Sequence, residues 1–417
     1  MVNFFYDCYT ILNKVYGEKA YVKQAINGTL IEEKNRAAII KTCYGVLDKD
    51  IELSYYIKVC TEKTPKLPIR TILKIGMYCI KYLGKKPYAV TQNAVELTKK
   101  LGKGGASGFV NFFLRKFSAE TPKLPDDFIE NLSVSYSYPS FAIKRLLNGY
   151  GKEKTLEILN NIDKCPTDNC LVFYDTDGKR YLQNLNVSFT ETPFNNVFRV
   201  NGFVRNCDYD AGVYTFQALC SVAICEAVEP CDKLLDCCAA PGGKSVRLSY
   251  KCKEITAWDI HAHRVNLIDE YSARMGVKNV TTSIKDAKEY DKALYETFDA
   301  VLCDAPCSGL GVVCGNPDIK INRTDADVVS LCKEQLAILN TVKNYVKKGG
   351  CLYYSTCSVL PDENYGTVKR FLSENDDFEI CPLKSPLPHD DIYGTKLFAD
   401  SSSGAFGFYV AKIRKKL

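Results

Sequence analysis

The sequence lacks the features that would send its product into or across a membrane. None of its apolar runs approaches the roughly 18 residues that a membrane-spanning helix requires. Its first residues, MVNFFYDCYTILNK, lack the basic, then apolar, then small-residue order of a secretory signal. We therefore expect a cytoplasmic protein with no membrane partner, whose first residues form a helix.

The sequence also lacks CxxC pairs, although it contains 20 cysteines. Zinc knuckles and ribbons are built on such pairs, so we expect no metal site. Many of the cysteines lie within apolar runs, where a free thiol in a reducing compartment behaves as a small hydrophobic side chain. A cysteine that does chemistry must therefore be identified by its surroundings.

Charge is unevenly distributed along the chain. Residues 1–125 contain 21 Lys and Arg but only 10 Asp and Glu, a net charge of +11, whereas residues 126–417 sum to −5. A basic region in front of a mildly acidic body indicates a polyanionic partner such as nucleic acid.

The 417 residues divide into three parts by their patterns. Residues 1–125 carry apolar residues at helical spacing and end in a proline-containing linker, which predicts an all-α helical bundle. Residues 126–205 mix short helical and strand-like stretches and predict a small α+β connecting subdomain. In residues 206–417, strand-like runs alternate with helices, which predicts a doubly wound α/β sheet. The clearest helix is expected at 324–348, ending in Lys347-Lys348-Gly349-Gly350.

The stretch LLDCCAAPGGKS (234–245) is the centre of the predicted site. An apolar run ends in an acid, and a Pro-Gly-Gly loop then opens a helix, so backbone N–H groups can hold a small ligand. Lys244 would lie in the first turn of that helix, where a cation opposes the helix dipole. Its position favours contact with an anion.

Four consecutive predicted strands end in or near an acidic residue: Asp236, Asp259, Asp286 and Asp304. Asp259 follows Asp236 by 23 residues, near the spacing of about 20 at which an acid binds ribose hydroxyls. GxGxxG and GxxxxGK[ST] are both absent, which argues against a dinucleotide and against a P-loop. The four acids indicate a nucleoside ligand, and a methionine-linked nucleoside, S-adenosylmethionine, would use Lys244 and the loop N–H groups for its carboxylate.

Cysteines follow the last two of these strands, in DAPCSG (304–309) and STCS (355–358). A thiolate that adds to carbon 6 of cytosine makes carbon 5 nucleophilic enough to accept a methyl group. A base then removes the carbon 5 proton and the thiol leaves. Two cysteines and an acid meet these needs, and the residues alone leave open which thiol attacks.

These motifs resemble the bacterial RsmB (Fmu/Sun) type of 16S ribosomal RNA cytosine-5 methyltransferase. The similar stretches are DCCAAPGGKS (236–245), DIHAHR (259–264), FDAVLCDAPCSGLGVVCGNPDIK (298–320) and YSTCSVLPDEN (354–364). Residues 1–118 resemble the NusB-like RNA-binding domain of this type, through CYGVL (43–47), KPYAVTQNAVELTKK (86–100) and FVNFFLRKF (109–117).

The resemblance implies a Rossmann-like class I methyltransferase that uses S-adenosylmethionine on ribosomal RNA, and we expect it to be a monomer. It implies that Cys357 is the nucleophile, that Cys307 resolves the adduct, and that Lys244 and Asp304 act on the reacting base. The residues implied to bind the cofactor are Cys238, Ala239, Ala240, Pro241, Gly242, Gly243, Lys244, Asp259, Arg264, Asp286 and Asp304.

The sequence departs from the family pattern at three places. Ala218 follows Gln217 where the family has Gln-Asp, Phe406–Tyr409 stand where it has Asp-Gly-Phe-Phe, and residues 170–175 lack an Arg-x-Asn. These departures concern substrate positioning.

There are two alternative functions, a non-catalytic RNA-binding or assembly factor and a DNA cytosine methyltransferase. The four residues assigned to chemistry are all present, which argues against the first. The basic helical front argues against the second.

Overall fold

The computed structural model describes residues 2–164, 169–200, 202–203, 205–400 and 405–417. The chain forms two units, which differ from the divisions of the sequence pattern. We call Met1–Asn148 with Val313–Thr324 the helical unit, and Gly149–Val312 with Asp325–Leu417 the sheet unit. Each is described by itself.

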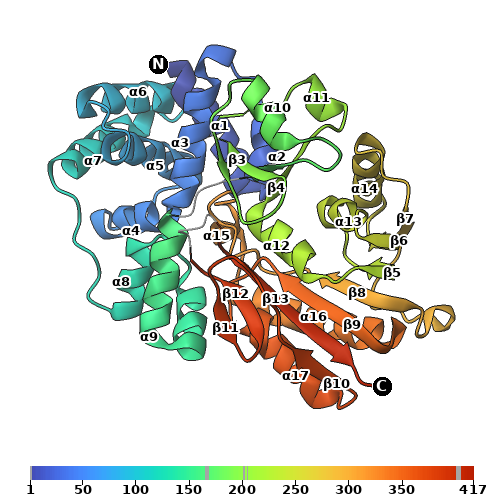
Figure 1. The fold of residues 1–417 in the computed structure, drawn as a ribbon. Coiled ribbons are helices and arrows are strands. Elements are labelled where there is room, and N and C mark those ends of the chain that lie inside the picture. Colours follow the sequence, from blue (N-terminus) through green and yellow to red (C-terminus); the bar gives the residue numbers. More distant parts are fainter. Residues whose placement is uncertain (1, 165–168, 201, 204, 401–404) are drawn as a thin grey trace. The chain divides into compact units, whose positions relative to one another are not determined.

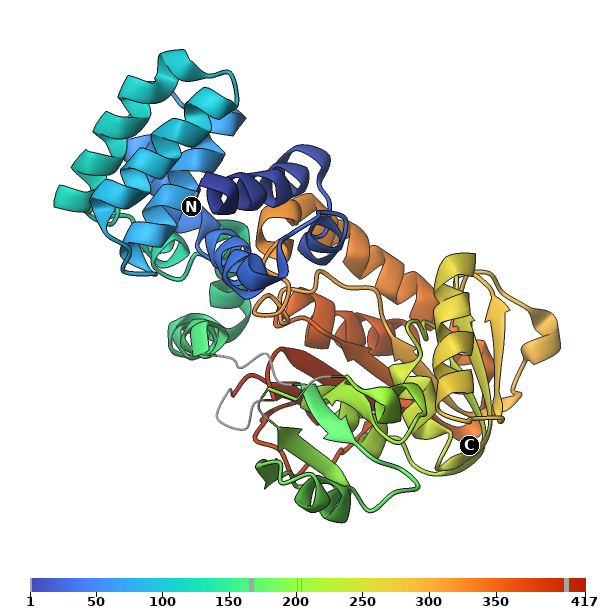
Figure 2. The same ribbon diagram turned by 90° about the horizontal axis from the view of Figure 1, so that it is seen from above.

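Helices make up the described secondary structure of the helical unit, as the spacing of apolar residues predicts (blue to green in Figure 2, with residues 313–324 in orange). They are α1 (Val2–Glu18), α2 (Val22–Asn27), α3 (Glu33–Asp48), α4 (Asp50–Cys60), α5 (Leu67–Lys81), α6 (Pro87–Lys100), α7 (Ser107–Ala119), α8 (Phe128–Ser135), the start of α9 (Ser140–Lys164), α15 (Ile319–Asn322) and the 3-10 turn η1 (Gly104–Ala106). Helix α5 is buried on most of its circumference and contacts α1, α3, α4, α6 and α7. It is the centre of this hydrophobic core.

A buried ion pair joins three helices of this unit. Lys74 of α5 places Nζ 2.5 Å from Oδ1 of Asp50 at the start of α4, and these side chains are only 9% and 11% exposed. The Tyr16 hydroxyl of α1 donates a hydrogen bond of 2.5 Å to the same oxygen. Removing one partner of such a pair leaves a buried charge uncompensated.

The sheet unit contains two sheets (Figure 1). A four-stranded antiparallel sheet has the order β2-β3-β1-β4, from β1 (Asn169–Val172), β2 (Phe189–Glu191), β3 (Val197–Val200) and β4 (Thr215–Ala218). The nine-stranded sheet has the order β11-β12-β13-β9-β8-β5-β6-β7, and β10 also pairs with β13. Its strands are β5 (Cys231–Asp236), β6 (Cys252–Asp259), β7 (Val280–Ile284), β8 (Phe298–Asp304), β9 (Val346–Thr356), β10 (Phe378–Cys381), β11 (Asp390–Ile392), β12 (Thr395–Phe398) and β13 (Phe408–Lys415).

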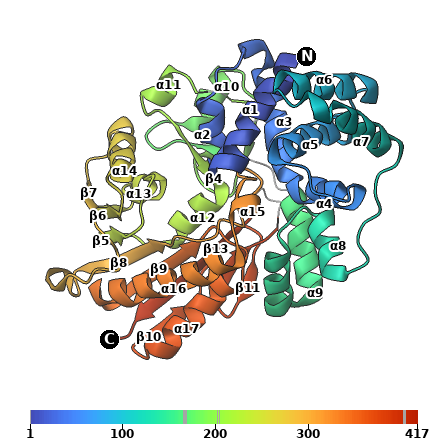
Figure 3. The same ribbon diagram turned by 180° about the vertical axis from the view of Figure 1, so that it is seen from behind.

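Strands β5 to β9 are parallel, and helices cover both faces of the large sheet. The helices of the sheet unit are the end of α9, α10 (Gly178–Asn184), α11 (Cys207–Asp210), α12 (Leu219–Ala227), α13 (Gly243–Leu248), α14 (Ala262–Arg274), α16 (Asp325–Val342) and α17 (Thr367–Glu374). Helices α12, α13 and α14 lie together on one face, and α16 packs against α17 on the other (Figure 3). This is the predicted doubly wound arrangement.

The direction in which the sheet grows reverses at β5, which pairs with β6 on one side and β8 on the other. Ligands of such sheets bind outside the carboxyl ends of the strands at this point. The predicted acids lie there: Asp236, Asp259 and Asp304 end their strands, and Asp286 follows β7 by two residues.

The predicted end of the helix at 324–348 is wrong. Helix α16 ends at Val342, a 3-10 turn (η3) covers Lys343–Tyr345, and Lys347 to Gly350 belong to β9. The pairing of β9 with β8 shifts register between Phe298 and Ala300, and Gly349 accommodates this irregularity with a φ of 75°. Gly349 and Gly350 therefore belong to an irregular stretch of β9 and not to the end of a helix.

None of the described helices is both long enough and apolar enough to cross a membrane.

We expect the Lys74→Ala substitution to lower the free energy of unfolding by about 3 kcal/mol, because the Asp50 carboxylate stays buried without its cation. Denaturant titration of the full chain measures the change. Lys58→Ala is the matched control, since Lys58 lies 3.8 Å from Glu130 and its side chain is 75% exposed. Such exposed pairs contribute at most about 1 kcal/mol. Equal losses in the two variants would contradict the role of the buried pair.

Candidate functional site

The loop between β5 and α13 is anchored to both neighbouring strands. The Cys237 N–H donates to the Leu302 carbonyl of β8 at 3.0 Å, and the Ala239 N–H donates to the Trp258 carbonyl of β6 at 2.8 Å. Gly242 turns the chain into α13 with a φ of 99°, and a Cβ there would lie 3.1 Å from Cα of Ile268. The glycine is therefore required by backbone conformation and by close packing.

Two adjoining cavities lie at the carboxyl ends of the parallel strands. The larger, of about 420 Å³, brings together predicted residues from all these strands: Cys238, Ala240, Asp259, Arg264, Asp286, Asp304, Cys307 and Cys357. The smaller, of about 200 Å³, is lined among others by Gln217, Asp236, Ala239, Pro241, Gly243 and Lys244. Gly242 lines neither cavity.

Lys244 and Asp304 form an ion pair between the two cavities. Nζ of Lys244 lies 2.5 Å from Oδ2 of Asp304, whose Oδ1 accepts a hydrogen bond of 2.6 Å from the Ser355 hydroxyl. Burial opposes the charge of Lys244, but the Asp304 carboxylate outweighs burial and raises the pKa of Lys244 above its usual range. Lys244 is therefore a cation and a hydrogen-bond donor at neutral pH. The anion that it contacts here is Asp304.

Two buried acceptor atoms face the smaller cavity without a partner among the described residues. They are Oδ1 of Asp236 and Oε1 of Gln217. Oδ2 of Asp236 accepts a hydrogen bond of 2.6 Å from Ser245, and burial raises the pKa of Asp236 to about 7. An unpaired buried acceptor costs free energy. A ligand with N–H donors would restore this free energy by donating hydrogen bonds to the two acceptors. The ammonium group of S-adenosylmethionine is such a donor, so these residues fit that cofactor.

Asp259 is the acid that the sequence predicts to bind ribose hydroxyls. Its carboxylate lines the larger cavity although the residue is only 4% exposed. Oδ1 accepts the His261 N–H at 3.1 Å, and Oδ2 lies 3.4 Å from Nη2 of Arg264. Arg264 also donates to the Ala240 carbonyl at 3.2 Å, which links this acid to the loop after β5.

Cys307 and Cys357 meet at the edge of the larger cavity. Their Sγ atoms are 3.1 Å apart, and the Cys357 N–H donates to Sγ of Cys307 at 3.3 Å. The hydrogen bond with Cys357 and burial raise the pKa of Cys307 well above its usual value. Cys307 therefore holds its proton, and either sulfur can be the donor of the hydrogen bond between them.

A buried carboxylate that the sequence analysis missed holds the two cysteine loops together. Glu363 is fully buried, and its Oε2 accepts hydrogen bonds of 2.5 Å from the hydroxyls of Ser308 and Ser358. Oε1 accepts the Ser308 N–H at 2.6 Å and the Gln335 amide of α16 at 3.3 Å. Each serine directly follows one of the cysteines. The available signal was the position of Glu363 within YSTCSVLPDEN.

The next residue, Asn364, brackets Cys357. Its Nδ2 donates to the Ser358 carbonyl at 2.9 Å, and its Oδ1 accepts the Thr356 hydroxyl at 2.6 Å. Both flanks of the cysteine are thus fixed by one amide side chain.

A glycine contact fixes the loop that carries Cys307. The Gly311 N–H donates to the Cys357 carbonyl at 3.1 Å. A Cβ on Gly311 would lie 2.0 Å from the Gly407 carbonyl oxygen, and one on Gly407 would lie 1.8 Å from that of Gly311. The departure at Phe406–Tyr409 therefore retains the glycine that the site needs.

The chain matches known families over most of its length. The family model described as 16S rRNA methyltransferase RsmB/F matches residues 223–414, and that of the NusB family matches residues 3–119. A probable ribosomal RNA small subunit methyltransferase B of Bacillus subtilis is 30% identical over 95% of this chain and 94% of the relative. The ribosomal RNA small subunit methyltransferase B of Shigella sonnei is 28% identical over 93% and 92%.

Solved structures share the fold. The crystal structure of PH0851 superposes with a TM-score of 0.81 at 21% identity, covering 98% of both chains. A methyltransferase homolog of Pyrococcus horikoshii gives a TM-score of 0.59 at 24% identity, over 70% of this chain and all of the other. The family and fold expected from the motifs are thereby confirmed. The chain belongs to the RsmB/F family of S-adenosylmethionine-dependent 16S ribosomal RNA methyltransferases, with a NusB-family region at residues 3–119.

Proposed function

We propose that this protein methylates carbon 5 of a cytosine in 16S ribosomal RNA through a covalent bond between Cys357 and carbon 6. The observation that carries the proposal is the pair of thiols 3.1 Å apart at the cavity that Asp304 and Asp259 also line. A methyltransferase acting on an oxygen, or on a nitrogen that is already nucleophilic, has no need of two thiols there.

The cofactor supplies an electrophilic methyl group when bound. Asp259 would accept hydrogen bonds from its ribose hydroxyls, and Asp236 and Gln217 would accept those of its ammonium group. The loop 238–244, Arg264 and Asp286 complete the proposed cavity.

Cys357 attacks carbon 6 with its sulfur, and Cys307, which keeps its own proton, lies 3.1 Å from that sulfur. Lys244 remains a cation and donates toward the charge that develops on the pyrimidine, while Asp304 accepts from the base. After carbon 5 has gained the methyl group, a base removes its proton. The electrons of that C–H bond form the carbon 5–carbon 6 double bond, and Cys357 leaves as a thiolate. Cys307 is placed to assist this release.

The basic front of the chain supplies the RNA contact in this proposal. Residues 1–125 carry the net charge of +11, which favours binding to a polyanion. Ribosomal RNA and S-adenosylmethionine are both cytoplasmic, so we place the reaction there.

Replacing Cys357 and replacing Cys307 should have different effects on the covalent adduct. We expect Cys357→Ala to abolish both methylation and the covalent RNA adduct, because the bond to carbon 6 never forms. Cys307→Ala should still form the bond but release it slowly, so an adduct should accumulate. A denaturing gel of each variant with RNA and S-adenosylmethionine measures this. An adduct with Cys357→Ala and none with Cys307→Ala would reverse the roles.

Cofactor binding should depend on Asp259. We expect Asp259→Ala to weaken S-adenosylmethionine binding by about 2 kcal/mol, the scale of a lost charge-assisted hydrogen bond. Calorimetric titration of the full chain without RNA measures the affinity. Asp269→Ala is the control, because Asp269 lies on α14 and its carboxylate binds Thr282 outside the cavities. Unchanged affinity in Asp259→Ala would remove the cofactor from this strand end.

Glu363 should affect kcat, because it positions the loops that carry Cys307 and Cys357. In Glu363→Gln an amide NH₂ replaces one acceptor, so a Ser308 or Ser358 donor loses its partner. We expect kcat to fall by about 10²-fold, the scale of a misplacement of about 1 Å, with KM for S-adenosylmethionine little changed. Glu374→Gln is the control, since Glu374 binds Asn340 and Arg370 at the surface. A wild-type kcat in Glu363→Gln would show that the buried carboxylate does not position the thiols.

A further inference from the structure

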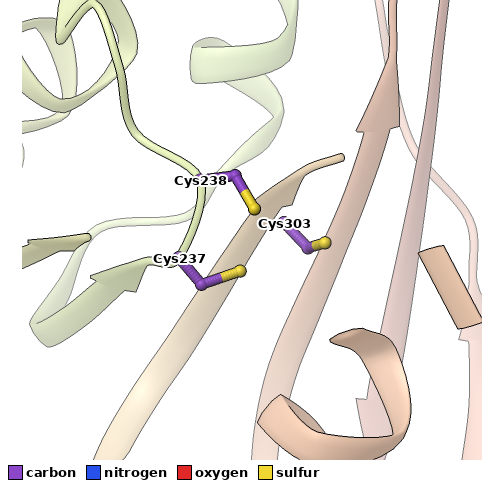
Figure 4. A group of neighbouring side chains, drawn as sticks. All are labelled: Cys237, Cys238 and Cys303. Carbon is purple, nitrogen blue, oxygen red and sulfur yellow. The ribbon is translucent and has the colours of Figure 1, made fainter. Parts of the chain in front are cut away.

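Three cysteines converge at the floor of the larger cavity. Two are adjacent in the loop after β5, and the third lies in β8. Asp236, the last residue of β5, is paired with Leu302 of the parallel strand β8. The hydrogen bond from the Cys237 N–H to the Leu302 carbonyl continues this register by one residue. Cys237 is thereby set beside Cys303, and Cys238 follows at the start of the loop. Figure 4 shows the three side chains directed into one space.

The spacing of the three sulfurs suits one ion. All three Sγ atoms lie within 4.8 Å of one another. Thiolates bound to a zinc-sized ion at about 2.3 Å are separated by about 4 Å from one another, so only a small closure is needed. The donor set is entirely sulfur, which selects thiophilic d10 ions over Mg²⁺ or Ca²⁺.

We propose that Cys237, Cys238 and Cys303 form a binding site for a thiophilic d10 divalent ion, of the Zn²⁺ and Cd²⁺ class, beneath the proposed cofactor site. Binding displaces the thiol protons to solvent, so affinity should rise with pH. The sequence analysis expected no metal site because it looked for closely spaced pairs. Here the sheet register supplies the third ligand, 66 residues after the first.

The path by which a metal ion reaches the three cysteines determines how its binding would affect the cofactor. Cys237 and Cys303 are buried, whereas Cys238 is partly exposed and lines both cavities. Cys237 also lines the larger cavity, so that cavity gives an ion a route to the group. Given the cofactor position proposed above, ion and cofactor should compete, which would make the enzyme sensitive to thiophilic metal.

Two further pairs of cysteines in the described sheet unit have their sulfurs in contact, and both must be kept out of the measurement. Cys307 and Cys357 are one, and their contribution is removed by working in a Cys357→Ala background. Cys231 and Cys252, with Sγ atoms 3.5 Å apart, are the other and offer only two sulfurs. Cys231→Ala is therefore a matched control, because it is the same substitution at the opposite end of β5 from the three cysteines.

The test is a Cd²⁺ titration of the full-length protein, reduced with a phosphine, followed by the ultraviolet sulfur-to-cadmium charge-transfer band and by calorimetry. We expect one tight site per chain. Cys303→Ala should weaken it at least 100-fold, and Cys231→Ala should leave it unchanged. Because Cys303 is a core residue, Cys237→Ala is measured as well, with thermal unfolding confirming that each variant is folded.

Unchanged Cd²⁺ binding in both Cys303→Ala and Cys237→Ala would overturn the site, and so would equal loss in Cys231→Ala. Saturating S-adenosylhomocysteine should weaken Cd²⁺ binding at least tenfold, and no effect would overturn the competition. The readout uses no RNA and no turnover, so its failure is distinguishable from failure of the proposed methylation.

Discussion

The ion pair between Lys244 and Asp304 is the interaction on which the rest of the site depends. It joins the first turn of α13 to the carboxyl end of β8, and the Ser355 hydroxyl extends the contact to β9. The two side chains are 12% and 29% exposed, so each charge has lost much of its hydration and is stabilised by the other. The loop before Lys244 lines the smaller cavity, in which we propose that the cofactor binds, and Cys307 follows Asp304 by three residues. The pair therefore fixes the distance between this cavity and the two thiols.

A second carboxylate, that of Glu363, holds together the loops that carry the two thiols. Glu363 accepts four hydrogen bonds, three of them from the serines that follow Cys307 and Cys357. Asp304 thus holds the ends of β8 and β9 on the cavity side, and Glu363 holds the loops after them on the core side. The short distance between the thiols follows from both constraints, since neither loop is free to move alone.

Much of the fold and of the site could be predicted because the relevant signals are local. A strand that ends in an acid, such as Asp259, and a loop such as 238–244 are each contained within a few residues. Their convergence follows from the rule that parallel strands present their carboxyl ends at one edge. The roles of Cys307 and Cys357 came from the motifs. They stay proposals, as does the division at residues 125 and 205.

The features that sequence reasoning missed depend on register. The predicted helix end at residues 347–350 failed because its Lys-Lys-Gly-Gly pattern suits a helix terminus and an irregular strand equally well. The role of Glu363 depends on which serines face it across two loops. The grouping of Cys303 with Cys237 depends on how β5 and β8 align. Periodicity within one segment carries no information about the alignment of two segments.

The proposed reaction depends on a covalent bond between Cys357 and a cytosine of 16S ribosomal RNA on the way to 5-methylcytosine. The most direct measurement uses RNA containing 5-fluorocytidine, in which carbon 5 has no proton to lose, so a methylated adduct cannot resolve. Digestion of the trapped complex and mass spectrometry identify the attached peptide and base. We predict a methylated fluorocytosine on the peptide that contains Cys357, and 5-methylcytidine as the product from ordinary RNA. Attachment through Cys307, or methylation of another atom without a trapped complex, would contradict the account.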